Sequence, residues 1–213
     1  MVCRTPVTPE SLTPCFKTAL PFILASASPR RREMLAAIGL EFGVEAAEAD
    51  EQVLPGEDPQ TFVIRIAQDK AQIVAKRYPG TWILAADTVV VENGDILGKP
   101  VDAEDAVLML KRLVDRTHEV WTGFCLCLAD QDKLLCQATK TEVQFADLPD
   151  QAILAYVRSG DPLDKAGSYG IQSLGGFMVR GIRGSYSNVV GLPLAEVIIE
   201  MTALGIIRAT ATS

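Results

Sequence analysis

The amino-acid sequence predicts an α/β fold in which helices flank a mixed central β-sheet. Two observations support this class. Short apolar runs alternate with amphipathic helical segments along the first half of the chain, which is typical of strands joined by crossover helices. Two further apolar segments, 120–128 and 134–145, then follow each other around a polar turn as a hairpin, and an antiparallel pair in such a fold makes the sheet mixed.

Local signals place the first elements. Residues 22–25 form a short apolar run, which we interpret as a buried strand. Ser28-Pro29 supplies the N-cap and first position of a helix that ends at Gly39. We predict a second strand over 41–47 and a polar loop over 50–58.

The middle and end of the chain continue the alternation. Asp58-Pro59 begins a helix that continues to about Tyr78, and residues 82–91 form the most apolar stretch, a central strand. The remaining predicted elements are a helix over 102–114, the hairpin, a helix over 149–158, a glycine-rich loop over 164–184 with a short strand at 177–179, and a helix from Pro193.

Composition bounds the organisation and the partners. The 213 residues suffice for one domain, which could form two lobes around a cleft. We predict a flexible extension over residues 1–18, which contain three prolines, and a single domain over 19–213. The net charge of −7 argues against a nucleic-acid partner. No run of about 18 apolar residues occurs, so we expect no membrane span.

The cysteines indicate the compartment. The five cysteines are odd in number and fit no CxxC zinc spacing. They are Cys3, Cys15, Cys125, Cys127 and Cys136. We expect free, mostly buried thiols in a reducing compartment, and therefore a cytoplasmic protein. Segment 19–27 resembles a signal peptide only loosely, because its apolar stretch is short and contains a proline.

The first candidate site is the segment 26–31, Ser-Ala-Ser-Pro-Arg-Arg, between a predicted strand and the start of a helix. Free backbone N–H groups and the helix dipole favour an anion there. Two hydroxyls and two guanidinium groups add donors, and guanidinium binds phosphate through two parallel hydrogen bonds. The candidates are Ser26, Ser28, Arg30 and Arg31. The alternative is an ordinary capped helix with solvated arginines.

Carboxylates form a second group of candidates. Asp87 is the only charged residue of segment 82–91, and a carboxylate in a buried strand needs a metal, a cation or a shared proton. At an exposed strand end it could bind a divalent cation or accept a proton from water. The alternative is an aspartate bonded to nearby backbone. Glu48, Asp50 and Glu51 could also supply oxygen ligands, or form a plain acidic surface loop.

Other candidates are less specific. Lys70 in mid-helix and Lys99 in a Gly-Lys-Pro turn could bind an anion or be ordinary surface lysines. In the segment 164–172, glycines let the backbone approach a ligand, and Gln172 could recognise a nucleobase edge; a purely structural loop has the same pattern. His118, the only histidine, has no nucleophile motif nearby, so we expect a structural role.

Together these segments resemble the Maf family of nucleotide pyrophosphatases. The resemblance extends from about Phe22 to about Ile206, and five motifs in order are far more specific than any one of them. They are Leu24-Ala25-Ser26-Ala27-Ser28-Pro29-Arg30-Arg31, Ala86-Asp87-Thr88-Val89-Val90, Leu97-Gly98-Lys99-Pro100, Asp164-Lys165-Ala166-Gly167-Ser168-Tyr169-Gly170-Ile171-Gln172 and Val190-Gly191-Leu192-Pro193-Leu194.

The resemblance implies a fold of the Maf and inosine-triphosphatase type and a reaction. Such enzymes cleave nucleoside triphosphates between the α- and β-phosphates, releasing pyrophosphate, and need a divalent cation, Mg²⁺ or Mn²⁺. By this resemblance Asp87 is the proton acceptor for the attacking water, and Glu51 is the metal-binding acidic residue. Asp87 is also a candidate metal ligand, and the sequence leaves open whether it is base, ligand or both. Basic residues that match phosphate-binding positions are Arg30, Arg31, Lys70 and Lys99. Residues that match positions tied to base preference are Arg30, Thr88 and Gln172.

The segment 164–172 is similar to the family branch that prefers dTTP and UTP. We therefore expect a dTTP and UTP pyrophosphatase, with CTP and modified pyrimidine nucleotides as further candidates. Two alternatives stay open: a 7-methyl-GTP pyrophosphatase, and a non-catalytic nucleotide-binding regulator of septum formation. Ser173 departs from the family pattern, which has glycine there, and we expect little effect. A homodimer also stays open.

Overall fold

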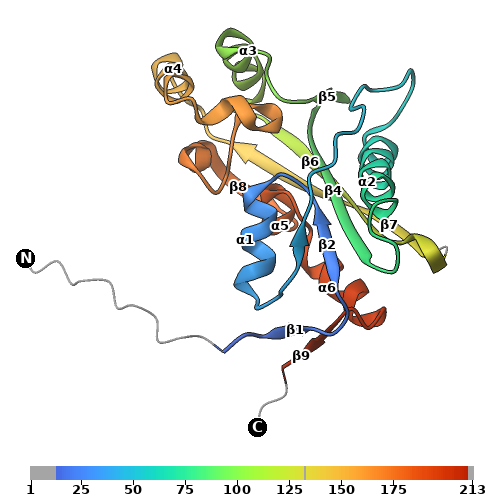
Figure 1. Cartoon of the computed structure of the whole chain (residues 1–213). Coiled ribbons are helices and arrows are strands. Elements are labelled where there is room, and N and C mark those ends of the chain that lie inside the picture. The colour runs from blue at the N-terminus through green and yellow to red at the C-terminus, as the bar shows by residue number, and fades with distance from the viewer. Residues whose placement is uncertain (1–12, 132, 211–213) are drawn as a thin grey trace, which may run out of the picture.

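A computed structural model describes residues 13–131 and 133–210 of the chain (Figure 1). Its main sheet has seven strands in the order β3-β2-β4-β6-β7-β8, with β5 paired to β4. The strands β2 (Phe22–Ala25), β3 (Gly43–Val44) and the long β4 (Trp82–Glu92) run parallel. The rest of the sheet is antiparallel. The predicted α/β class with a mixed sheet is confirmed.

The antiparallel half is built on the predicted hairpin. Its strands are β6 (Thr117–Leu128) and β7 (Lys133–Phe145), and β8 (Val179–Arg183) pairs with the outer edge of β7. The short β5 (Asp95–Leu97) turns back on the end of β4. The predicted strand at 177–179 begins later, because 174–178 forms a 3-10 turn.

Helix α2 (Pro59–Ala75) covers one face of the sheet (Figure 1). Its small buried residues Ala67 and Ala71 pack against the strand residues Ile83 and Ala85 of β4. Gly123 of β6 allows a close approach, since a Cβ there would collide with the backbone of Val63 in α2. The helix start predicted at Asp58-Pro59 is confirmed, and the Asp58 side chain accepts from the Thr61 N–H. Ser28 is the N-cap of α1 (Pro29–Ala37) as predicted, but its side chain forms no cap hydrogen bond.

The other face is covered by two groups of helices. Helices α1 and α6 (Leu194–Ala203) cover a core around Phe22, Leu84 and Phe124. Helices α3 (Ala103–Leu113) and α4 (Asp150–Arg158) cover a separate core around Val90 and Phe145. Thr88 lies between these two cores on β4, where a space opens between the helix groups.

The structure corrects two expectations. Residues 16–18 of the predicted extension form β1 (Phe16–Thr18), which pairs with β9 (Ile207–Ala209) near the other end of the chain; residues 1–12 lie outside the described part. Cys125 and Cys136 are not free thiols but form a disulfide, because they face each other across β6 and β7 with Cα atoms 4.2 Å apart.

Smaller differences remain. Cys15 and Cys127 are free as expected, and Cys3 lies outside the described residues. The strand predicted over 41–47 is reduced to β3, and a short helix, α5 (Tyr186–Val190), was not predicted. In the part of the chain that is described, no helix is both long and apolar enough to cross a membrane.

Candidate active site

A cavity opens beside a stretch of β4 whose edge is paired with neither β2 nor β5. Pairing with β2 stops at Ala25 and Ala85, and pairing with β5 starts only at Val90. The intervening edge carries Asp87 and Thr88. The cavity has a volume of about 520 Å³. It lies beyond the carboxyl ends of parallel strands, the usual place of ligand sites in α/β sheets.

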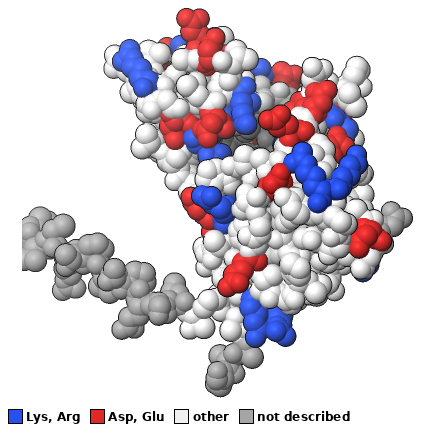
Figure 2. All heavy atoms as spheres, viewed as in Figure 1, with Lys and Arg blue, Asp and Glu red and all other residues white. Residues whose placement is uncertain are grey.

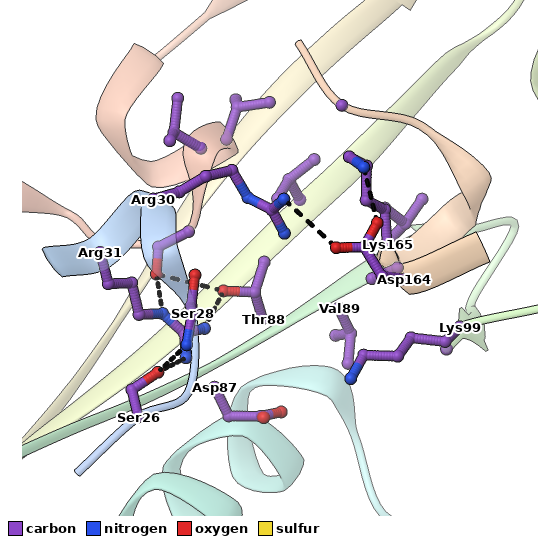
Figure 3. Close-up of a pocket in the computed structure, with 18 of the residues that line it drawn as sticks. Ser26, Ser28, Arg30, Arg31, Asp87, Thr88, Val89, Lys99, Asp164 and Lys165 are labelled. Carbon is purple, nitrogen blue, oxygen red and sulfur yellow. Dashed lines mark hydrogen bonds and ion pairs between the residues drawn. The ribbon is translucent and has the colours of Figure 1, made fainter. Parts of the chain in front are cut away.

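Ten of the residues that we singled out from the sequence line this cavity. They are Ser26, Ser28, Arg30, Arg31, Glu51, Lys70, Asp87, Thr88, Lys99 and Gln172. Two other members of the acidic loop, Glu48 and Asp50, are not among the lining residues. Figure 2 shows acidic and basic side chains crowded around a hollow in the upper half of this face, and Figure 3 shows several of the lining side chains converging from different elements.

Lys70 joins two carboxylates at the base of the cavity. Its Nζ donates to Glu51 Oε1 at 2.6 Å and to Asp87 Oδ1 at 2.7 Å. Lys70 and Asp87 are both buried, whereas half of the Glu51 side chain is exposed. Gly123 lies opposite Asp87 on β6 and lets α2 come close enough for this contact. The hydrogen-bond partner of Asp87 is therefore the Lys70 ammonium group and not a nearby backbone group.

The charges around Glu51 favour its ionised form. Burial raises the pKa of this carboxyl, but the hydrogen bond and charge of Lys70, with Lys99 and Arg31, outweigh burial and lower the pKa overall. Its second oxygen, Oε2, and Asp87 Oδ2 accept no hydrogen bond from any described residue. Two carboxylates thus converge on one cation and each keeps a free oxygen.

Arg31 is buried and is largely engaged by protein acceptors. Its Nε donates to the carbonyl oxygen of Gly191 at 2.7 Å, and its Nη1 to Ser26 Oγ at 3.1 Å and to the carbonyl oxygen of Ala86 at 2.8 Å. Its Nη2 donates to Thr88 Oγ1 at 2.9 Å. A guanidinium group has five N–H donors, so these four bonds leave one for a ligand. Burial lowers the pKa of Arg31, and the charge of Asp87 opposes this effect.

Arg30 and Lys99 reach into the cavity from opposite sides (Figure 3). Arg30 is 3.6 Å from Asp164, and 28% of its side chain is exposed. Lys99 is exposed and forms no salt bridge with any residue in 13–131 or 133–210. These two cations are therefore better placed than Arg31 to meet a polyanion.

The loop after α4 contains hydrogen bonds that the sequence did not predict. Lys165 lines the cavity and is buried, and its Nζ donates to Asp164 Oδ1 at 2.6 Å and to the backbone and side chain of Asp161. Asp161 also accepts from Tyr156 and Ser173. No local pattern marks Asp161, because its partners come from separate elements.

Gln172 and His118 have opposite surroundings. Gln172 is exposed and lines the cavity, and its side chain forms no hydrogen bond within the described ranges. His118 is buried, donates to or accepts from Tyr169 Oη at 2.8 Å and packs edge-on against Phe145. It does not line the cavity, in keeping with the structural role expected for it.

Comparisons with known proteins show the family of this chain. A relative from Geobacter sulfurreducens is 51% identical over 86% of this chain and 96% of its own length, and one from Myxococcus xanthus is 49% identical over 86% and 92%. Both are described as dTTP/UTP pyrophosphatase. The Staphylococcus aureus Ham1 protein aligns with a TM-score of 0.39 at 14% identity, covering 60% of this chain and 72% of its own. The family model described as "Maf-like protein" matches residues 21–204, and the chain belongs to this family.

Proposed function

We propose that this protein hydrolyses dTTP and UTP to the nucleoside monophosphate and pyrophosphate. The observation that carries the proposal is the pair of carboxylates, Glu51 and Asp87, held at the base of a cavity whose rim supplies Arg30 and Lys99. A triphosphate carries about four negative charges, so such a site needs cations to bind it and carboxylates to activate water. The names of relatives about half identical to this chain supply the substrate class.

The residues present fit a divalent cation such as Mg²⁺ or Mn²⁺. Within the described ranges, no three His, Cys, Asp or Glu side chains form a metal-binding cluster. Mg²⁺, however, is commonly held by one or two carboxylates together with substrate phosphates, and Glu51 and Asp87 each offer a free oxygen beside Lys70. These two residues would hold the ion. When bound, it neutralises phosphate charge and acidifies water.

The chain's own residues then share the remaining work. Asp87 accepts the proton of the attacking water, and the water oxygen bonds to the α-phosphorus. The bond between the α-phosphorus and the α–β bridging oxygen breaks, and pyrophosphate leaves with that oxygen. The hydroxyls of Ser26 and Ser28, near the start of α1, donate to phosphate oxygens. Lys70 has used two of its three N–H donors and offers the third. Thr88, Arg30 and Gln172 contact the nucleoside.

A substrate panel tests this proposal. Pyrophosphate release is measured with dTTP, UTP, CTP, dATP, GTP and 7-methyl-GTP, each with Mg²⁺ or Mn²⁺. We expect the highest kcat/KM for dTTP and UTP. A clear preference for 7-methyl-GTP would instead place the protein in the other enzymatic branch. Tight nucleotide binding without turnover of any triphosphate would support a regulatory role and refute the proposed reaction.

A further inference from the structure

We propose that Asp161, Tyr156 and Ser173 form a clamp that fixes Gln172 for base recognition, so that Ser173 is a positioning residue for pyrimidine selectivity. This inference rests on the proposed function, because it assumes that the cavity binds a nucleotide. The clamp consists of hydrogen bonds between residues that lie next to the cavity lining but not in it. Gln172 itself borders the cavity, and the three clamp residues are not among those that line it.

The centre of the clamp is one carboxylate oxygen with two hydroxyl donors. Asp161 Oδ2 accepts from Tyr156 Oη at 2.7 Å and from Ser173 Oγ at 2.7 Å. The other oxygen, Oδ1, is 3.1 Å from Lys165 Nζ. Burial raises the pKa of Asp161, but the hydrogen bonds from Ser173, Tyr156 and Lys165 outweigh it and lower the pKa overall. Asp161 therefore stays ionised near neutral pH, where it binds hydroxyl donors most strongly.

Both ends of the turn that carries Gln172 are attached to this centre. At one end the Gly170 N–H donates to Tyr156 Oη at 3.3 Å. At the other, Ser173 Oγ lies 2.7 Å from Asp161 Oδ2 and 3.2 Å from the Gly170 carbonyl oxygen. A hydroxyl has a single proton, so the shorter contact to the carboxylate receives it. The two residues between these attachments are Ile171 and Gln172.

Tight packing reinforces the attachment. A Cβ on Gly170 would collide with Ser173 Oγ and lie 2.7 Å from Lys165 Cε, and a Cβ on Gly175 would lie 2.7 Å from Tyr156 Oη. The turn therefore rests directly on the clamp. Gln172, by contrast, is exposed and has no side-chain partner in the part of the chain that is described. The side-chain amide of Gln172 can therefore bind a ligand, while the attachments at Gly170 and Ser173 hold the backbone of the turn in place.

Removal of the Ser173 hydroxyl breaks the bond of this end of the turn to Asp161, while the Ser173 N–H still donates to the Gly170 carbonyl oxygen. No residue that lines the cavity is changed. A residue that must be ordered on binding contributes less to affinity than one already held in place. The loss should therefore fall on substrates whose base contacts Gln172. A glycine at position 173 would lack this attachment, so the serine gives the loop of this chain a constraint of its own. The proposal therefore replaces our expectation from the sequence that the serine has little effect.

The test is the substrate selectivity of Ser173→Ala. We expect the ratio of kcat/KM for UTP over that for ATP to fall about three- to tenfold, the effect of one hydrogen bond, mainly through KM for UTP. Ser173→Thr, which keeps the hydroxyl, should restore the ratio. In a Gln172→Ala background, Ser173→Ala should cause no further loss. Leu174→Ala is the matched control, because its exposed side chain does not line the cavity, and it should behave as wild type.

Three results would overturn the clamp. In the first, the ratio of kcat/KM values is the same in Ser173→Ala as in the wild type. In the second, Ser173→Ala lowers kcat/KM equally for all substrates. In the third, the loss caused by Ser173→Ala adds in full to the loss caused by Gln172→Ala in the double variant. Binding of non-hydrolysable UTP and ATP analogues to the same variants, measured by calorimetry, gives a second readout of the ratio. If the wild type hydrolyses no triphosphate, the proposed function fails, while these binding ratios still decide for or against the clamp.

Discussion

His118 shows how burial alone sets the behaviour of a residue. It is 1% exposed, its Nε2 is bonded to Tyr169, and its Nδ1 is buried with no partner in the described ranges. Burial lowers its pKa from 6.5 to about 4, and the charge of Glu92 only weakly opposes this. Protonation of His118 would place an unpaired charge in the core around Phe145.

A pH dependence of stability follows from this pKa. Because the pKa of His118 is lower in the folded protein, the unfolded chain binds more protons between pH 4 and pH 6.5. The contribution to the free energy of unfolding is full above about pH 6.5 and is lost as the pH falls. We expect a loss of about 2 kcal/mol between pH 7 and pH 5.

Urea unfolding at pH 7, 6 and 5 measures this loss. His118→Gln removes the titrating group but keeps an amide near Tyr169. Between pH 7 and pH 5 the free energy of unfolding of this variant should therefore fall by about 2 kcal/mol less than that of the wild type. The lowered carboxyl pKa values of Glu51, Asp161 and Asp164 act in the same direction, but only as the pH falls below about 4 to 5. An equal pH dependence in wild type and variant would rule out His118 as the cause.

At the scale of elements, α1 supplies the missing partner of β4. Where β2 ends, Arg31 of α1 donates to the Ala86 carbonyl oxygen of β4 and to Gly191 at the end of α5. The same guanidinium orients the hydroxyls of Ser26 and Thr88 toward one side of the cavity. One side chain thus joins three elements and closes a strand edge that the sheet leaves open.

Arg31→Lys tests this function of α1. A lysine keeps the charge but cannot match the planar, forked donors of arginine, so several buried acceptors would lose their partner. We expect a loss of about 2–3 kcal/mol in the free energy of unfolding and at least a tenfold lower kcat/KM. Arg32→Lys, at an exposed position on the same helix, should change neither quantity. If Arg31→Lys keeps wild-type stability, Arg31 does not join these elements.

The elements also show what sequence could and could not predict. The starts of α1 and α2 were predicted correctly from Ser28-Pro29 and Asp58-Pro59, although only the Asp58 side chain bonds within the first turn of its helix. The β1–β9 pair and the Cys125–Cys136 disulfide depend on which strands become neighbours and in which register. The sequence does not show that register. The Asp161 clamp has another cause: its members lie within residues 156–173, but only the folded turn brings Ser173 back to Asp161.

At the scale of the whole molecule, the cavity results from a sheet that is covered unevenly. Helix α2 covers one face (Figure 1). On the other face Thr88 lies between two separate cores. Segments far apart in sequence meet there, including the start of α1, the acidic loop, β4 and the loop after α4. The motifs identified the residues of this site, but only the fold shows that Lys70 joins Glu51 to Asp87.

The central claim is that Asp87 carries the hydrolysis. The most direct measurement is pyrophosphate release from dTTP and UTP with Mg²⁺ by wild type, Asp87→Asn and the control Asp50→Asn, whose side chain is outside the cavity lining. The amide cannot accept the proton of the attacking water, so we predict a kcat at least about 100-fold lower in Asp87→Asn, with a folded protein and full activity in Asp50→Asn. Wild-type turnover by folded Asp87→Asn would contradict the account.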